Sequence, residues 1–194
     1  MRERPLPGIG DAPAGGARNL FFALCPGEGT RDAIAAQAER LKRGHAPRGR
    51  WIKPHRYHLT LHFLGTHAHL PDALVAAALA AGDEVRASPF EFALDRAGSF
   101  ANRSIPWWLG CARPDAGLAM LHDGIAAALR AGGRRIRNGK RLVAHVTVLR
   151  DADRALPPTP IEPISWPVAE FVLIDSLLGE QASHAVLRRW PLRA

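Results

Sequence analysis

The chain has 194 residues, of which 47% are hydrophobic and 23% are charged, a balance typical of a globular protein. Its formal net charge of +8 favours polyanionic partners such as nucleic acid but does not decide the chemistry. The two cysteines, Cys25 and Cys111, are too few for a disulfide framework or a zinc site, and no apolar run reaches the ~18 residues of a membrane span.

The beginning of the chain differs from the rest in composition. Residues 1–17 are rich in Pro, Gly and Ala and have no periodic apolar pattern, so we predict a disordered leader. They also lack the continuous apolar core of a secretory signal. We therefore expect a cytoplasmic protein.

Hydrophobic periodicity and turn residues predict the elements of the first half. In chain order they are a strand over 19–24, a helix over 30–43 with Thr30 as its N-cap, a basic loop over 44–56, a strand over 57–64 that Gly65 ends, and a helix over 70–81. The strand over 57–64 alternates polar and apolar residues, as a half-buried strand should.

The second half continues the alternation of strands and helices. Its predicted elements are strands over 90–94 and 105–111, a helix over 115–131, a strand over 141–149, a proline-rich connection over 157–163, and strands over 169–174 and 184–187. Such a sequence of elements indicates an α+β or α/β protein.

One tetrapeptide pattern occurs twice. His58-Leu-Thr-Leu61 recurs as His145-Val-Thr-Val148, each time within an alternating strand, which indicates two related lobes. Because successive side chains of a strand point to opposite faces, the His and Thr of each copy share one face and the apolar residues share the other. Each strand would then anchor one face in a core and present the other to a cleft.

Two imidazoles and two hydroxyls around one small group are suited to phosphodiester hydrolysis. One imidazole can take a proton from water while the other protonates the leaving oxygen, and both roles are available to histidine near neutral pH. Threonine hydroxyls can donate to the phosphate oxygens where charge gathers. A single His-x-Thr would be an ordinary satisfied or exposed histidine, and the second copy is what favours the functional interpretation.

The two segments also resemble a known family. Residues 56–65 (RYHLTLHFLG) and 144–150 (AHVTVLR) are similar to the two signature motifs of the 2′-5′ RNA ligase family, the RNA 2′,3′-cyclic phosphodiesterases of the LigT-like, two-histidine phosphoesterase superfamily. Residues 106–110 (PWWLG) and the ending 183–192 fit the same family, so the resemblance covers residues 18–192.

The resemblance implies an α+β, bilobal LigT-like fold, in which two pseudo-symmetric antiparallel sheets flank a cleft and helices lie outside. Residues 18–194 would form this single domain. It implies hydrolysis of an RNA terminal 2′,3′-cyclic phosphate to a 2′-phosphate without metal or cofactor. His58 would be the proton donor and His145 the proton acceptor, while Thr60 and Thr147 would bind the phosphate.

Two further site residues follow from the resemblance. Phe63 would stack on the terminal base and Arg150 would meet phosphate charge. In a regular strand, however, Phe63 would share the buried face of Leu59 and Leu61, and a solvated arginine is ordinary at a strand end. His184 stands where the family often has Tyr, which leaves any contact there open.

Other residues of the same segments allow more than one interpretation. His62 is expected to share the face of His58 and Thr60, but such a pair is too far apart for a metal site and lacks a carboxylate or Cys beside it. The basic run of residues 42–56 could guide RNA to the cleft or could be a solvated loop.

Three rival functions remain at this point. The same site could act on a small cyclic nucleotide, or join RNA ends through a 2′-5′ linkage, or the protein could be a basic module that holds RNA ends without cutting them. The expected partner is RNA with a 2′,3′-cyclic phosphate end, and we expect neither a membrane nor a metal, and a monomer.

Overall fold

The computed structural model describes residues 16–101, 103–113, 115–134, 142–179 and 182–193. Nearly all of the predicted leader, residues 1–17, lies outside them. The helices are α1 (Glu28–His45), α2 (Asp72–Glu84) and α3 (Ala116–Ala131), with a 3-10 turn at Pro54–Arg56. The strands are β1 (Arg18–Leu24), β2 (Arg50–Trp51), β3 (Leu59–His67), β4 (Phe90–Ser99), β5 (Ile105–Gly110), β6 (His145–Ala152), β7 (Thr159–Val168), β8 (Glu170–Leu177) and β9 (Ser183–Pro191). No described helix is both long and apolar enough to cross a membrane.

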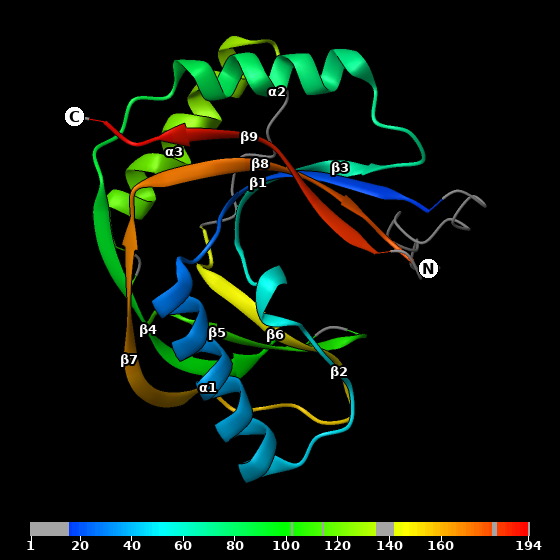
Figure 1. The fold of residues 1–194 in the computed structure, drawn as a ribbon, viewed down its shortest axis with the longest axis vertical. Helices are drawn as coiled ribbons and strands as arrows, with labels where there is room; N and C mark the ends of the chain where they lie inside the picture. The colour runs from blue at the N-terminus through cyan, green and yellow to red at the C-terminus, as the bar shows by residue number, and fades with distance from the viewer. Residues whose placement is uncertain (1–15, 102, 114, 135–141, 180–181, 194) are drawn as a thin grey trace, which may run out of the picture.

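The described strands form one antiparallel sheet in the order β7-β4-β5-β6-β3-β1-β8-β9, and β2 pairs with β6. The sheet has two halves of four strands, and they meet where β3 pairs with β6 through Leu59 and Val146. From this junction the two halves diverge toward the right of Figure 1. The predicted α+β class is confirmed, and the two predicted antiparallel sheets are joined here as the two halves of one sheet.

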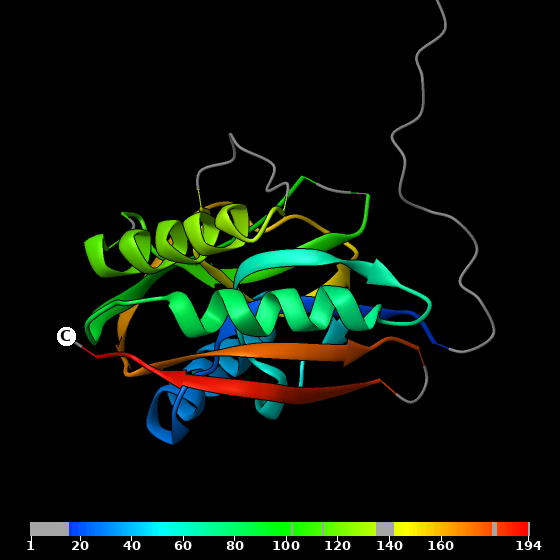
Figure 2. The same cartoon turned by 90° about the horizontal axis from the view of Figure 1, so that it is seen from above.

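The helices cover the outer face of the sheet. Helices α2 and α3 lie side by side there (Figure 2), and α2 packs through Gly82 against Trp190 of β9. Helix α1 contacts β7, where the Thr30 hydroxyl donates to the carbonyl oxygen of Ser165 at 3.0 Å. The prediction that Thr30 caps this helix is therefore wrong, because the helix begins at Glu28 and the hydroxyl lies within its first turn.

Strand β7 lies where the sequence predicted a connection. Residues 157–163 are rich in proline, which cannot donate a ladder hydrogen bond in the middle of a sheet. In the structure β7 lies at the edge of the sheet and pairs with β4 alone. An edge strand tolerates prolines whose missing N–H would point away from its partner, so the prediction of a connection is wrong for residues 159–163.

A bulge in β3 changes which of its side chains are buried. Phe22 of β1 pairs with His62 and Ala23 pairs with Thr60, so Leu61 is an extra residue on β3. Alternation is broken there. Leu61 and His62 are both buried, while Phe63 is turned out with 55% of its surface exposed.

The bulge corrects the prediction for His62. Its side chain points toward α3, where Nε2 donates to the carbonyl oxygen of His122 at 2.7 Å and the two rings stack with centroids 4.1 Å apart. His62 does not share the face of His58 and Thr60, because the extra residue reverses the direction of the side chains that follow it, as far as the next register shift of β3, between Phe63 and Gly65.

We expect the junction of the two halves to be sensitive to cavity formation. Leu59 is completely buried there, so Leu59→Ala should lower the free energy of unfolding by about 2–5 kcal/mol, measured by urea denaturation. The matched control is Leu187→Ala on β9, where the side chain is 39% exposed. The control should lower the free energy of unfolding by less than half as much. Equal losses in the two variants would contradict the conclusion that the junction at Leu59 is especially sensitive to a cavity.

Candidate active site

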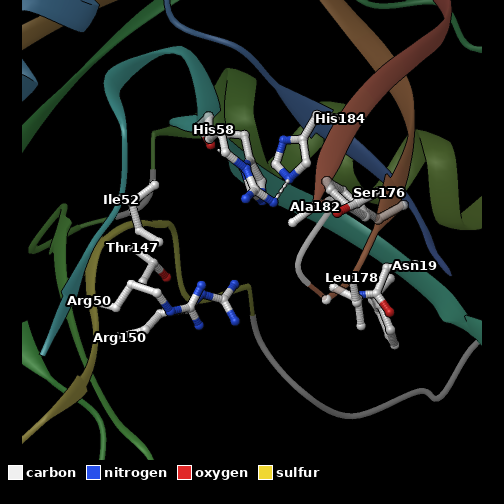
Figure 3. A pocket seen from close by; sticks show the side chains of 14 residues that line it. Asn19, Arg50, Ile52, His58, Thr147, Arg150, Ser176, Leu178, Ala182 and His184 are labelled. Carbon is white, nitrogen blue, oxygen red and sulfur yellow. Dashed lines mark hydrogen bonds between the residues drawn. The ribbon is translucent and has the colours of Figure 1, made fainter. Parts of the chain in front are cut away.

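A pocket of about 470 Å³ lies between the two halves of the sheet (Figure 3). The fourteen residues that line it are Asn19, Phe21, Arg50, Ile52, Arg56, His58, Phe63, Thr147, Arg150, Ser176, Leu178, Gly179, Ala182 and His184. Four of the six predicted site residues are among them. The other two, Thr60 and His145, are outside this lining but lie beside it.

The pairing of β3 with β6 brings the two His-x-Thr motifs together. Leu59 pairs with Val146, and both side chains are completely buried. Antiparallel register extended by one residue on either side places His58 opposite Thr147 and Thr60 opposite His145. Residues directly opposite in such a ladder have Cβ atoms ~5 Å apart. All four polar side chains are half-buried, on the face opposite to Leu59 and Val146.

Both histidines are held in the same tautomer by the backbone. His58 Nδ1 lies 2.8 Å from the carbonyl oxygen of Arg56, and His145 Nδ1 lies 2.7 Å from that of Val143. A carbonyl oxygen only accepts, so each Nδ1 carries a hydrogen and donates it. Each Nε2 is therefore the nitrogen left for chemistry, as a base when neutral and as an acid when protonated.

Burial keeps both imidazoles neutral in the free protein. Burial lowers the pKa of His58 to about 4, and the nearby charges of Arg150, His145 and Arg56 add to the effect. Burial also lowers the pKa of His145. A bound anion would have the opposite effect, because it stabilises the protonated form of a neighbouring imidazole. The protonation state of the site is thus set by what occupies it.

Each histidine lies against an aromatic ring from its own half of the protein. The rings of Phe21 and His58 have centroids 5.0 Å apart, and those of Phe100 and His145 are 4.9 Å apart at nearly right angles. Phe21 is buried in a small cluster on the pocket side of β1 and β8. These contacts restrict the orientation of both imidazoles.

Three basic residues of the pocket, Arg50, Arg56 and His184, were not among the predicted site residues. Arg50 and Arg56 belong to the basic run of residues 42–56, for which two interpretations were open, and only these two basic side chains of the run line the pocket. His184 also lines it, and its ring centroid is 5.1 Å from that of His58. Basic composition gave a weak signal for the arginines, whereas the place of His184 depends on β9 returning beside the site.

The described residues offer no evident place for a metal ion. Among them there is no group of three or more His, Cys, Asp or Glu side chains that could hold one. The charged side chains that line the pocket are the arginines Arg50, Arg56 and Arg150, which suit an anion.

Comparisons with known proteins agree with this geometry. A family model described as LigT like Phosphoesterase matches residues 26–108. An RNA 2′,3′-cyclic phosphodiesterase of Thermus thermophilus is 30% identical over 189 residues, which cover 90% of each chain. The crystal structure of Escherichia coli LigT in its apo form has a TM-score of 0.73 and 31% identity, covering 92% of this chain and 99% of that one. The crystal structure of TT0787, also from Thermus thermophilus, has a TM-score of 0.71 and 26% identity, covering 90% and 98%.

We expect NMR titration of the histidine ring protons to place the pKa of His58 near 4 and that of His145 below 6.5 in the free protein. Inorganic phosphate should raise both values, because an anion favours the imidazolium. Chloride at equal ionic strength is the control, and His58→Gln and His145→Gln assign the signals. A pKa above 6.5 for either histidine without phosphate would contradict the role given to burial.

Proposed function

Because the chain belongs to the LigT-like phosphoesterase family, we propose that it hydrolyses the terminal 2′,3′-cyclic phosphate of RNA to a 2′-phosphate. The observation that carries the proposal is the pairing of Leu59 with Val146, which brings two His-x-Thr motifs to one junction. In each motif the histidine has its Nε2 free. Two groups with interchangeable acid and base forms are what this reaction requires.

In the proposed reaction His145 is the proton acceptor and His58 the proton donor. Nε2 of His145 takes a proton from a water molecule, whose oxygen forms a bond to phosphorus. The bond between phosphorus and the ribose 3′-oxygen breaks, and that oxygen takes the proton from Nε2 of His58. The phosphate remains on the 2′-oxygen. Proton exchange with solvent then returns the two imidazoles to their starting forms.

The remaining site residues bind the substrate in this proposal. Thr60 lies beside His145 and Thr147 beside His58, so their hydroxyls can donate to non-bridging phosphate oxygens where negative charge increases. Arg150 supplies a charge-assisted contact from the lining of the same pocket. Phe63, exposed at the pocket because of the β3 bulge, stacks on the terminal base.

The proposal includes no metal and no partner subunit. The imidazoles and the arginines supply the positive charge that a metal would otherwise supply, and a single chain provides all six residues named above. A module that only held RNA ends would have no use for two half-buried imidazoles whose Nε2 atoms are available for proton transfer, so we favour hydrolysis over binding alone.

We expect His58→Ala and His145→Ala each to lower turnover of a cyclic-phosphate RNA by at least about 10²-fold, since each removes one acid–base role. The assay is run with a chelator present, and mass spectrometry with phosphatase treatment identifies which hydroxyl keeps the phosphate. His69→Ala is the control, because His69 is an exposed loop residue outside the pocket.

Three results would count against the proposal. Unchanged turnover in both histidine variants would contradict acid–base catalysis by His58 and His145. A product with a 3′-phosphate would contradict the assignment of the ribose 3′-oxygen as the leaving group. Loss of activity in chelator, followed by recovery on adding a divalent metal, would overturn metal independence.

The pH optimum of kcat/KM should lie below 6.5, the ordinary pKa of an imidazole. The base must be neutral and the acid protonated, and the pKa of each imidazole is below 6.5 in the free protein. Both limbs of the bell in kcat/KM, which reports the free enzyme, should therefore fall below pH 6.5. The optimum in kcat should be higher, because bound phosphate raises both pKa values. A kcat/KM that still rises between pH 6.5 and 8 would contradict this.

A further inference from the structure

The side chain of Arg56 is held in the pocket by His184. Nη2 of Arg56 lies 3.0 Å from Nε2 of His184, the contact drawn as a dashed line in Figure 3. A guanidinium group can only donate, so Nε2 of His184 accepts and its hydrogen is on Nδ1. His184 is therefore neutral, in agreement with burial and nearby cations lowering its pKa to about 4. The contact orients Arg56 without neutralising it.

The positive charge in this pocket exceeds what its own residues balance. Arg50, Arg56 and Arg150 line it, and none of its fourteen described lining residues carries a carboxylate. Arg50 forms an ion pair with Asp151 at 3.5 Å. No described carboxylate lies within 4.0 Å of Arg56 or Arg150. Burial and the neighbouring arginines lower the pKa of Arg56 and of Arg150, which means that they disfavour the charged guanidinium groups. A bound anion would stabilise these charged groups.

The side chain of Arg56 is held differently from the groups assigned to the reacting phosphate, because its partner is His184. The cyclic phosphate carries one negative charge and is met by the two His-x-Thr motifs and Arg150. His184 of β9 lies beside His58, in the same half of the sheet, and across the pocket from Thr147 and Arg150 (Figure 3). Arg56 is thus available for a second anion on the side of the pocket that His184 forms.

We propose that Arg56 binds the phosphate on the 5′-oxygen of the terminal nucleotide and that His184 is a positioning residue for this contact. The inference rests on the proposed function and names its substrate class. In an RNA that ends in a cyclic phosphate, the next phosphate is attached to the 5′-oxygen of the same ribose. The site then prefers an oligonucleotide, or a nucleotide with a 5′-phosphate, over a cyclic mononucleotide with a free 5′-hydroxyl.

The test compares three substrates with the same cyclic-phosphate end: adenosine with a 5′-hydroxyl, adenosine with a 5′-phosphate, and the dinucleotide ApA. Arg56→Gln should lower the preference for the second and third substrates over the first, measured as a ratio of kcat/KM, by about tenfold or more. The loss should lie mainly in KM, because this phosphate does not change during the reaction. Equal effects on the second and third substrates identify the phosphate itself as the recognised group, and an effect on the dinucleotide alone would contradict that assignment.

Three further variants separate anion binding by Arg56 from a general disturbance of the pocket. His184→Phe should lower the same ratio less, and the double variant should be no worse than Arg56→Gln, because His184 acts through Arg56. Lys53→Gln is the control, since Lys53 lies in the same basic run but outside the pocket. Its ratio should equal that of the wild type.

The possible failures are distinguishable. If Arg56→Gln loses activity equally on all three substrates, or if the wild type does not discriminate among them, the subsite is wrong while the proposed function stands. If the wild type hydrolyses none of them, the proposed function itself is wrong. For a variant with no measurable turnover, calorimetric affinity for ApA carrying a 2′-phosphate replaces kinetics, and affinity equal to that of the wild type would overturn the subsite.

Discussion

The site depends on one backbone pairing, that of Leu59 with Val146. Both side chains must stay buried, so the pleat of the two strands forces the neighbouring His and Thr side chains to the opposite face. Antiparallel direction then sets each histidine across from the threonine of the other motif. The same constraint gives the two imidazoles similar surroundings, with a carbonyl oxygen two residues back and an aromatic ring alongside.

The electrostatics of the pocket are those of a site that is complete only when an anion is bound. The protonated forms of His58 and His145 and the guanidinium groups of Arg56 and Arg150 are both disfavoured in the free protein, as the lowered pKa values of all four show. In the proposed reaction, a bound phosphate would stabilise both kinds of charged group and, by raising the imidazole pKa, would favour the protonated form of His58 that the reaction needs. The substrate would then supply part of the catalytic arrangement.

The periodicity of the sequence predicted much of the fold and the faces of the four motif residues, because alternation is a local property of a strand. It could not place Phe63 or His62, whose directions depend on one extra residue at Leu61 that only pairing with β1 reveals. It also missed β7, because its prolines are acceptable only on a strand with a single neighbour. Arg56 and His184 meet across 128 positions of the chain, and no local pattern joins them.

The edge formed by β7 has a consequence for the assembly of the protein. A row of free N–H and C=O groups at the margin of a sheet can recruit a strand from another molecule, and such growth would lead to aggregates. Pro160, Pro163 and Pro167 have no N–H, so a strand laid beside β7 would find a gap in the hydrogen-bond ladder wherever such a proline faces the free edge. The prolines that hide β7 from a strand prediction thus also make this edge a poor template for a strand of another molecule.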